Sequence, residues 1–440
     1  MTKRRQAHKQ PKLPFIGGLM QKLVGDGYLT LIDGAGRTYR FGDERSETKV
    51  IARLHDPRLP LRLALSPSPS LTLGEAYMDG RITFESGTLR DFLAIVTSNI
   101  AALDGHPLQA IKARLGALAR RRRNRKRHAR ANVAHHYDLS GALYELFLDT
   151  DRQYSCAYFA RGDERLEAAQ AAKRRHLAAK LLLRPGDEIL DIGSGWGGLA
   201  LELAREADVR VRGITLSSEQ LEAARARADG AGLAERVRFD LLDYRDLSGR
   251  FDRIVSVGMF EHVGPAHYDD FFMVVAKALK PKGVAVIHSI GRRSPPGGAD
   301  PWISRYIFPG GYVPALSEVL AAVERSGLWA TDIEILRVHY AETLRRWHDR
   351  FQRNRHRVRA LYDERFCRMW EFYLAMCETM FSQGDLMVFQ IQMAHCHEAV
   401  PIIRDYITDF DRRGAASGLA ADELRPAKAN APAEREKEAA

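Results

Sequence analysis

The stretch EILDIGSGWGGLALELA, residues 188–204, decides the fold class of this chain. A short apolar run ends at Asp191, glycines follow, among them Gly193 and Gly195, and a helical pattern then begins. Glycine permits positive φ angles and lets a ligand approach the backbone closely. Because open α/β sheets bind ligands at the carboxyl ends of their strands, this turn predicts a site for a nucleotide-like ligand.

Strand-like and helix-like segments alternate downstream of this turn. The strand-like runs are rich in β-branched residues and read VRVRGITL (209–216), RVRFDLLD (236–243), FDRIVSVG (251–258) and GVAVIHSIG (283–291). Helical patterns such as SEQLEAARARADGAG and HYDDFFMVVAKALK lie between them. The alternation predicts a Rossmann-like α/β domain over residues 132–411, with a parallel, doubly wound sheet that is followed by helices.

A smaller α+β domain is expected at the N-terminus, over residues 13–119, because 440 residues exceed what one core usually holds. YLTLIDGAGRTYRFG (28–42) predicts a β-hairpin with a DGAG turn, and SPSPSLTLGEAYMDGRI (66–82) predicts a loop. LRDFLAIVTSNIAAL (89–103) predicts a helix. We find no catalytic constellation here and expect a module that binds lipid or forms a homodimer.

Charge indicates an anionic partner. The formal net charge is +11, and RRRRNRKRHAR concentrates it in a basic linker that we place at residues 120–131. The run is either a solvated basic segment or an attachment to anionic lipid. It lacks the interleaved aromatic residues expected for single-stranded nucleic acid, so we expect no nucleic-acid partner. The alanine-, glutamate- and lysine-rich tail, residues 412–440, predicts disorder.

The sequence disfavours a membrane-spanning, secreted or metal-binding protein. No segment is long and apolar enough to span a bilayer, and no apolar core of signal-peptide length follows the basic N-terminus, so we expect a cytoplasmic protein. The four cysteines form no Cys-x-x-Cys pair, and HCHE (395–398) has no matching ligand cluster, so we expect no metal site.

The residues after the second strand help to identify the ligand. A dinucleotide site usually has an acidic residue there for the ribose, but the first carboxylate is Glu219, and Thr215 and Gln220 are the nearer polar groups. Asp243 ends the third strand, where it could accept a hydrogen bond from an adenine amino group. The phosphate-binding glycine pattern is also imperfect, which favours S-adenosylmethionine over a dinucleotide.

At this point the chain resembles the cyclopropane-fatty-acyl-phospholipid synthases and the related mycolic acid cyclopropane synthases. The resemblance covers nearly the whole chain, and more loosely the N-terminal domain. The motifs that carry it are HHYDLSGALYELFLD, QYSCAYF, LDIGSGWGGLA, GITLSSEQ, DYRDL, FDRIVSVGMFEHVG, HSIG, YIFPGGYVP, HYAETLRRW and FYLAMCETMF. The family uses S-adenosylmethionine to add a methylene group across a cis double bond of an acyl chain.

The resemblance implies contacts to S-adenosylmethionine. Tyr154 and Ser155 match positions beside the sulfonium, and Gly193 and Gly195 match the turn beside the methionine part. The remaining implied contacts, to ribose or adenosine and around the adenine, are Thr215, Gln220, Tyr244 and Arg245.

The resemblance also implies a bound bicarbonate ion as the base that removes a proton from the transferred methyl group. The matching pocket residues are Cys156, Glu261, His288, Ile290 and Tyr340, with Cys156 and Ile290 offering backbone groups. Glu261 and His288 follow the fourth strand and end the fifth, so the strand assignment independently places both at the ligand edge. Glu261 acts either through its hydrogen-bond network or in its protonated form.

Cys377 matches the cysteine that the family marks as an active-site residue. It belongs to a helical stripe that suits either an acyl tunnel or plain core packing: Phe366, Met369, Trp370, Tyr373, Cys377, Met380 and Phe381. Aromatic faces can stabilise a carbocation, and the candidates are Tyr306, Phe308, Tyr312 and Tyr340, although core packing is favoured for the first three. We expect His262 to cap or pack locally, and His135 and His136 to be structural or lipid-facing.

The predicted function is S-adenosylmethionine-dependent methylene transfer to unsaturated acyl chains of membrane phospholipids, with the enzyme bound peripherally to the inner face of the membrane. Three alternatives stay open: a methyl-branched or methylene product, a small-molecule methyltransferase, and a lipid-binding protein without activity. The intact set of Glu261, His288 and Tyr340 argues against the last of these.

Overall fold

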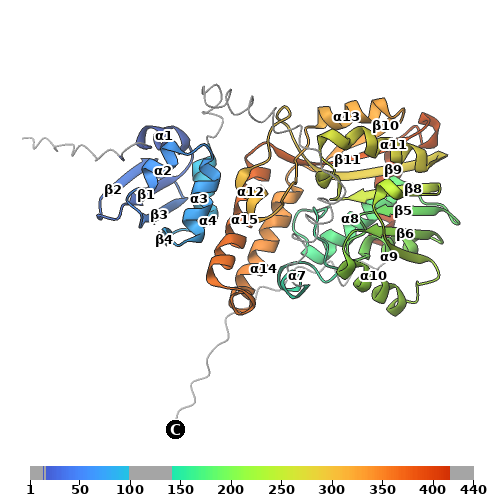
Figure 1. Cartoon of the computed structure of the whole chain (residues 1–440), viewed down its shortest axis with the longest axis horizontal. Helices are drawn as coiled ribbons and strands as arrows, with labels where there is room; N and C mark the ends of the chain where they lie inside the picture. Colours follow the sequence, from blue (N-terminus) through green and yellow to red (C-terminus); the bar gives the residue numbers. More distant parts are fainter. Residues whose placement is uncertain (1–12, 14–15, 99–140, 417–440) are drawn as a thin grey trace, which may run out of the picture.

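The computed structural model describes residues 13, 16–98 and 141–416, which form an N-terminal α+β domain and a larger C-terminal α/β domain (Figure 1). The expected linker at 120–131, the boundary at residue 119, and His135 and His136 all lie outside the described residues. Within the described part of the chain, no helix is long and apolar enough to cross a membrane.

The N-terminal domain contains a four-stranded sheet in the order β2-β1-β3-β4. Its strands are β1 (Tyr28–Ile32), β2 (Thr38–Gly42), β3 (Lys49–Leu54) and β4 (Ile82–Ser86), and its helices are α1 (Gly17–Leu23), α2 (Leu59–Leu65), α3 (Pro69–Met78) and α4 (Leu89–Thr97). The predicted hairpin is confirmed, because β1 and β2 pair antiparallel with Ile32 opposite Thr38. Asp33 fixes the turn by accepting from the backbone N–H groups of Ala35 and Arg37.

The prediction of a loop over residues 66–82 is wrong for most of its length. Helix α3 begins at Pro69, and proline is tolerated in the first turn, where its missing N–H has no intrahelical partner. The predicted helix after it is confirmed over Leu89–Thr97 as α4, which begins at a capping box formed by Thr88 and Asp91, and the rest of the prediction from residue 99 lies outside the described residues.

The C-terminal domain is built on a seven-stranded sheet in the order β10-β11-β9-β8-β5-β6-β7. All five predicted strands are confirmed as parallel neighbours: β5 (Glu188–Ile192), β6 (Arg210–Thr215), β7 (Val237–Leu241), β8 (Phe251–Val257) and β9 (Leu279–Arg292). One face packs against α8 (Leu166–Leu181), α9 (Gly198–Glu206) and α10 (Ser218–Gly230), and the other packs against α11 (Tyr268–Ala278) and α13 (Leu316–Arg325).

Two strands correct the expectation that the chain turns wholly helical after β9. Strand β11 (Leu386–Ala394) pairs antiparallel with β9, and the edge strand β10 (Trp329–Ile335) pairs antiparallel with β11. Both strands carry polar side chains toward α8, so neither shows the continuous apolar run that is typical of buried parallel strands.

Further helices complete the C-terminal domain. They are α7 (Gly141–Phe147), α12 (Pro301–Tyr306), α14 (His339–Leu361), α15 (Glu364–Ser382) and α16 (Asp405–Ala416), with short 3₁₀ turns η2 (Tyr244–Asp246), η3 (Phe260–His262), η4 (Pro265–His267) and η5 (His397–Ala399). The boundary expected at residue 411 therefore falls inside α16.

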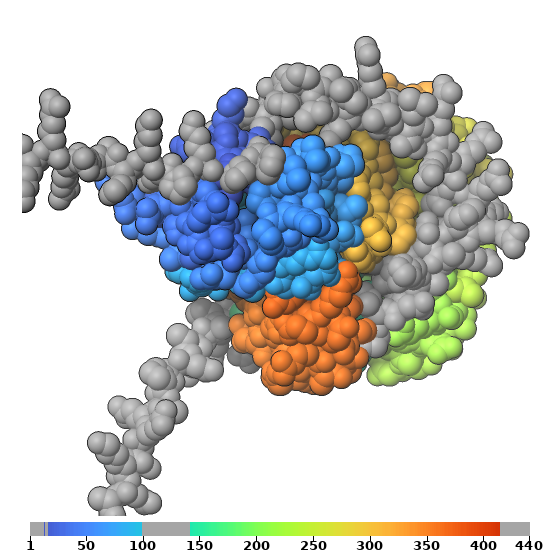
Figure 2. Space-filling model, turned by 60° about the vertical axis from the view of Figure 1, so that its left-hand side comes forward, coloured from blue at the N-terminus to red at the C-terminus, as the bar shows by residue number. Residues whose placement is uncertain are grey.

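Helix α15 forms the contact between the domains. It packs against α3 and α4, and the N-terminal domain lies directly on the α14–α15 pair (Figures 1 and 2). Polar contacts fix this packing: Tyr77 donates to the buried Glu371 at 2.8 Å, and Arg90 donates to Glu378 at 2.6 Å. One hydrophobic core runs through both sides of the contact, so the two domains share part of their interior.

Candidate active site

A small cavity of about 150 Å³ lies at the carboxyl ends of β5, β6 and β8, where the glycine turn predicted it. Gly193 and Gly195 adopt φ angles of 85° and 54°, a left-handed conformation that favours glycine. A Cβ atom on Gly193 would lie 2.8 Å from the Cβ of Met259. The turn therefore requires glycine for both its conformation and its close packing.

Most of the predicted cofactor residues line this small cavity. They are Tyr154, Ser155, Gly193, Gly195, Thr215, Gln220 and Tyr244. Thr215 donates its hydroxyl to the side-chain oxygen of Gln220 at 3.0 Å, which leaves the amide nitrogen of Gln220 as a donor for a ligand.

Asp243 and Arg245 are not among the residues that line it. The Asp243 carboxylate accepts two side-chain hydrogen bonds from Arg245, at 2.8 and 2.6 Å, and is thereby held as an ion pair. The predicted contact from Asp243 to an adenine amino group has no support in this arrangement, and Tyr244 alone of the three reaches the cavity.

Asp191 is a site residue that sequence reasoning noted without giving it a role. It is buried, lines the small cavity, and its Oδ2 atom has no hydrogen-bond partner among the described residues. Burial raises the pKa of this carboxyl to about 7. A buried, unpartnered carboxylate oxygen beside a glycine turn fits a ligand with an ammonium group, and S-adenosylmethionine carries one on its methionine part.

A second cavity, of about 590 Å³, adjoins the first and runs between the two domains. Its far end lies in the N-terminal domain, where the lining is almost entirely apolar and includes Ile16, Leu19, Met20, Leu23, Leu31, Leu54, Leu63, Leu73, Ile82, Phe92, Leu93 and Val96. A cavity of this size and lining suits a long apolar chain.

The two cavities meet at a shared wall. Tyr154, Ser155, Gly258 and His262 line both of them. This corrects the expectation that His262 packs only locally, and burial lowers the pKa of its ring to about 4, so the ring is neutral near pH 7. The four shared residues therefore form a junction at which the small cavity lies directly beside the apolar cavity.

The six predicted catalytic and bicarbonate residues all come together in the wall of the large cavity: Cys156, Glu261, His288, Ile290, Tyr340 and Cys377. They come from β9, η3, α14, α15 and the loop before α8. The strand assignment anticipated this for Glu261, which follows β8, and for His288, the last β9 residue paired with β8. Strand β9 itself runs on to Arg292, so the expectation that the fifth strand ends at His288 is wrong.

Glu261 is held by one oxygen and free at the other. Its Oε1 atom accepts the backbone N–H of Ile290 at 2.7 Å, and its buried Oε2 atom has no partner among the described residues. Burial raises the pKa of this carboxyl to about 7 despite the hydrogen bond from Ile290. The N–H of Ile290 thus bonds to Glu261, and a backbone contact from Ile290 to bicarbonate stays a prediction.

His288 is buried and neutral. Its Nδ1 atom contacts the side-chain nitrogen of Gln390 at 3.1 Å. Burial, reinforced by the positive charges of Lys173, Lys180 and His176, holds the pKa of the ring well below its usual range. A neutral histidine and a carboxyl that is readily protonated can both donate to a small anion, so the pair fits a bicarbonate ion.

The two cysteines of the cavity are thiols. Burial raises the pKa of both Cys156 and Cys377 well above the usual range, and the Cys156 thiol donates to the carbonyl of Ala157 at 3.3 Å. A thiol is a weak nucleophile compared with a thiolate. The position of Cys377 in the wall favours a lining role over plain core packing.

The aromatic candidates divide into two groups. Phe308, Tyr312 and Tyr340 line the large cavity, whereas Tyr306 donates its hydroxyl to Glu75 at 2.8 Å and belongs to the domain contact. The α15 stripe divides likewise. Tyr373, Cys377, Met380 and Phe381 line the cavity, and Phe366, Met369 and Trp370 lie outside its lining.

The sheet order, the glycine turn and the paired cavities define an S-adenosylmethionine-dependent methyltransferase of the Rossmann-like class. A family model described as mycolic acid cyclopropane synthetase matches residues 124–391. The chain belongs to this family of S-adenosylmethionine-dependent cyclopropane synthases.

Individual relatives agree. Cyclopropane-fatty-acyl-phospholipid synthase of Escherichia coli (strain K12) is 41% identical over 324 residues, which cover 73% of this chain and 82% of the relative. A probable fatty acid methyltransferase of Pseudomonas putida is 38% identical over 376 residues, covering 77% and 92%. The structure of the cyclopropane synthase MmaA2 from Mycobacterium tuberculosis superposes with a TM-score of 0.57 at 34% identity, covering 60% of this chain and 98% of that one. Mycolic acid cyclopropane synthase CmaA1, complexed with SAH and CTAB, gives the same score and identity and covers 60% and 97%.

Proposed function

We propose that this protein transfers the methyl carbon of S-adenosylmethionine to the cis double bond of an acyl chain in a membrane phospholipid and closes it to a cyclopropane ring. The observation that carries the proposal is the junction of the two cavities. Tyr154 and Ser155 stand between the glycine turn and an apolar cavity whose wall holds Glu261 and His288. The donor and an acyl chain would meet there.

The chain's own residues orient the donor. Asp191 would accept from its ammonium group, Gln220 would donate to its ribose, and the glycine turn would admit its methionine part. When bound, S-adenosylmethionine supplies an electrophilic methyl group. The junction would direct that group toward the large cavity.

The large cavity binds the acyl chain and tolerates positive charge on it. Aliphatic side chains of the N-terminal domain hold one end of the chain. Phe308 and Tyr340 present aromatic rings to the cavity, and such rings attract a cation that is shielded from water. These residues lower the free energy of a carbocation without offering a nucleophile.

Glu261 and His288 would hold bicarbonate, which supplies the base for the proton lost from the transferred methyl group. Glu261 acts in its protonated form, because a hydroxyl on Oε2 donates to the anion whereas a carboxylate repels it. A purified enzyme depleted of carbon dioxide should lose activity and recover it on addition of bicarbonate. We expect Glu261→Ala to need more bicarbonate, while Glu261→Gln, which keeps a donor, behaves like the wild type near pH 6. Full activity without bicarbonate would refute this part.

We also propose that the protein works at an anionic bilayer, on the cytoplasmic face, because its substrate lies in the membrane and its net charge is +11. Co-sedimentation should show stronger binding to vesicles containing phosphatidylglycerol than to phosphatidylcholine vesicles, and weaker binding at high salt. Equal binding to both would remove the electrostatic explanation.

The product is tested with purified protein, S-adenosylmethionine and vesicles of a monounsaturated phospholipid. Mass spectrometry should show the gain of one CH₂ unit per modified chain, and the product should resist hydrogenation. A methyl-branched or methylene product is the alternative, favoured by the fatty acid methyltransferase among the relatives. A methylene product takes up hydrogen, and a soluble small-molecule methyltransferase would leave the vesicles unchanged.

A further inference from the structure

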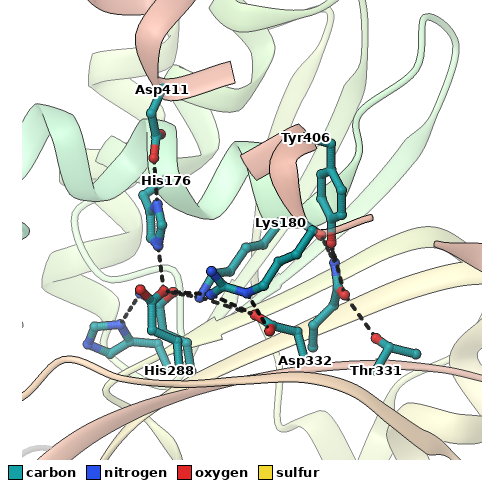
Figure 3. A network of polar contacts seen from close by, with 11 residues as sticks. His176, Lys180, His288, Thr331, Asp332, Tyr406 and Asp411 are labelled. Atoms are coloured by element: carbon teal, nitrogen blue, oxygen red, sulfur yellow. Dashed lines mark hydrogen bonds and ion pairs between the residues drawn. The ribbon is translucent and has the colours of Figure 1, made fainter. Parts of the chain in front are cut away.

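Three polar side chains form a row across one face of the sheet behind the cavity. His288 on β9 lies opposite Gln390 on β11, and Gln390 lies opposite Glu334 on β10. Gln390 is completely buried, and its amide nitrogen lies 3.1 Å from Nδ1 of His288. Figure 3 shows His288 at one end of the resulting network and Asp411 of α16 at the other.

Helix α8 covers this row with three basic side chains, Lys173, His176 and Lys180. Spacings of three and four residues put them on one face of the helix, and all three are buried. His176 bridges Glu334 and Asp411, at 2.7 and 2.8 Å, and Lys180 also pairs with Glu334.

Lys173 donates to the Oγ atom of Ser155, at the junction of the two cavities. Asp332 and Arg404 complete the charged groups around Glu334. Cationic groups therefore face His288 from α8 and oppose the addition of a proton to its ring.

We propose that Gln390 is a positioning residue that fixes His288 as the tautomer with its proton on Nε2. A neutral imidazole carries one proton, and the hydrogen bond made by one ring nitrogen decides which nitrogen holds it. An amide nitrogen can only donate, so its 3.1 Å contact with Nδ1 is a hydrogen bond only if Nδ1 is the acceptor, which puts the proton on Nε2. A ring anchored at Nδ1 by the sheet presents its N–H to the cavity, as hydrogen bonding to a small anion requires.

This inference rests on the proposed function only in placing His288 at the reacting centre. The tautomer itself can be measured in the full-length protein without cofactor, by ¹⁵N NMR of histidine-labelled enzyme. The His288 signal is assigned as the one missing from His288→Phe. Gln390→Glu keeps the shape of the side chain and, when ionised at alkaline pH where the spectra and kcat are measured, offers only an acceptor, and Gln390→Met keeps its length without a hydrogen bond.

Gln392 provides the matched control. It lies on the same face of β11, is buried, and donates to the backbone carbonyl of Lys180 and to Tyr406, so Gln392→Met also removes buried hydrogen bonds from this strand. Any effect of general destabilisation should appear equally in both Met variants, whereas an effect on His288 should appear only at position 390.

The expected result is an Nε2-protonated His288 in the wild type and in Gln392→Met, and an Nδ1-protonated ring in Gln390→Glu. We expect kcat to fall about 10- to 100-fold in both Gln390 variants with an unchanged KM for S-adenosylmethionine. Nδ1 protonation in the wild type, or a spectrum and kcat that Gln390→Glu leaves unchanged, would overturn the inference. Failure of the proposed function would give a different result. The wild type would then form no product, but Gln390→Glu would still change the tautomer of His288.

Discussion

The hydroxyl oxygens of Tyr154 and Tyr373 lie 2.9 Å apart at the boundary between the donor cavity and the apolar cavity. Tyr154 also stacks on Trp347, with ring centroids 5.2 Å apart. Tyr373 belongs to α15, the helix that packs against the N-terminal domain. Helix α15 thus links the position of Tyr154, a predicted contact to S-adenosylmethionine, to the N-terminal domain that lines the far end of the apolar cavity.

Removing the hydroxyl of Tyr373 should slow the reaction without weakening donor binding. Tyr373→Phe keeps the ring but loses the hydrogen bond that orients Tyr154, an effect of about 1 kcal/mol or roughly fivefold in kcat. Calorimetry should give an unchanged dissociation constant for S-adenosylhomocysteine. Tyr77→Phe loses a comparable bond to Glu371 outside the junction and should leave kcat unchanged. Equal kcat values for wild type and Tyr373→Phe would contradict this role.

The N-terminal domain should determine how long a chain the enzyme accepts. Leu31 and Leu54 are buried in its sheet and line the far end of the apolar cavity. Leu54→Phe should lower kcat/KM for the longest acyl chains and spare shorter ones, although overpacking costs about 1–3 kcal/mol of stability. Leu29→Phe is the control, because Leu29 is equally buried but does not line the cavity. If kcat/KM depended on acyl chain length in the same way in both variants, this domain would not determine the chain length that the enzyme accepts.

Protein stability should depend on pH through Glu261. Its pKa in the folded protein is about 7 against an ordinary value of 4.5, so folding favours the protonated form. The resulting stabilisation is fully present below about pH 4.5 and is lost as the pH rises through about 7.

The wild type should therefore lose up to roughly 3 kcal/mol of unfolding free energy relative to Glu261→Gln between pH 4.5 and pH 8. Denaturant titrations of the two proteins at several pH values measure the difference. Because Asp191 is shared by both proteins, its own raised pKa cancels in the comparison. Parallel stability curves would mean that Glu261 ionises normally.

Cys377 should prove dispensable for the chemistry. Its thiol has a raised pKa and lines an apolar wall, so Cys377→Ala should retain kcat within about tenfold, whereas loss of a true nucleophile costs roughly 10⁴-fold or more. Cys377→Trp, which fills the cavity, should abolish activity while leaving donor binding intact. A fall in kcat of roughly 10⁴-fold in Cys377→Ala would instead support Cys377 as a catalytic residue.

The sequence predicted those parts of the fold that depend on local patterns. Buried parallel strands appear as apolar runs, so β5 to β9 and the glycine turn were identifiable. Strands β10 and β11 were not, because their buried faces carry Glu334, Gln390 and Gln392, whose partners come from α8, β9 and α16. Helix α3 was missed because its proline and serines also fit a loop.

The site residues also divide into those that local sequence patterns could place and those that only the packed structure reveals. Glu261 follows β8 and His288 is the last residue of β9 that pairs with β8, so both could be placed at the ligand edge from sequence. Asp191 stood in the quoted turn, but only its burial without a partner indicates a role. The extension of the cavity into the N-terminal domain depends on packing between distant segments, which no local pattern encodes.

The central claim, ring closure by loss of a proton from the transferred methyl group, is tested most directly with S-adenosylmethionine whose methyl group is fully deuterated. Vesicles of a monounsaturated phospholipid are treated with the enzyme, and the modified chains are examined by mass spectrometry before and after hydrogenation. The account predicts an added unit that keeps two of the three deuterium atoms and a product that does not take up hydrogen. Retention of all three deuterium atoms, or a product that hydrogenates readily, would contradict it.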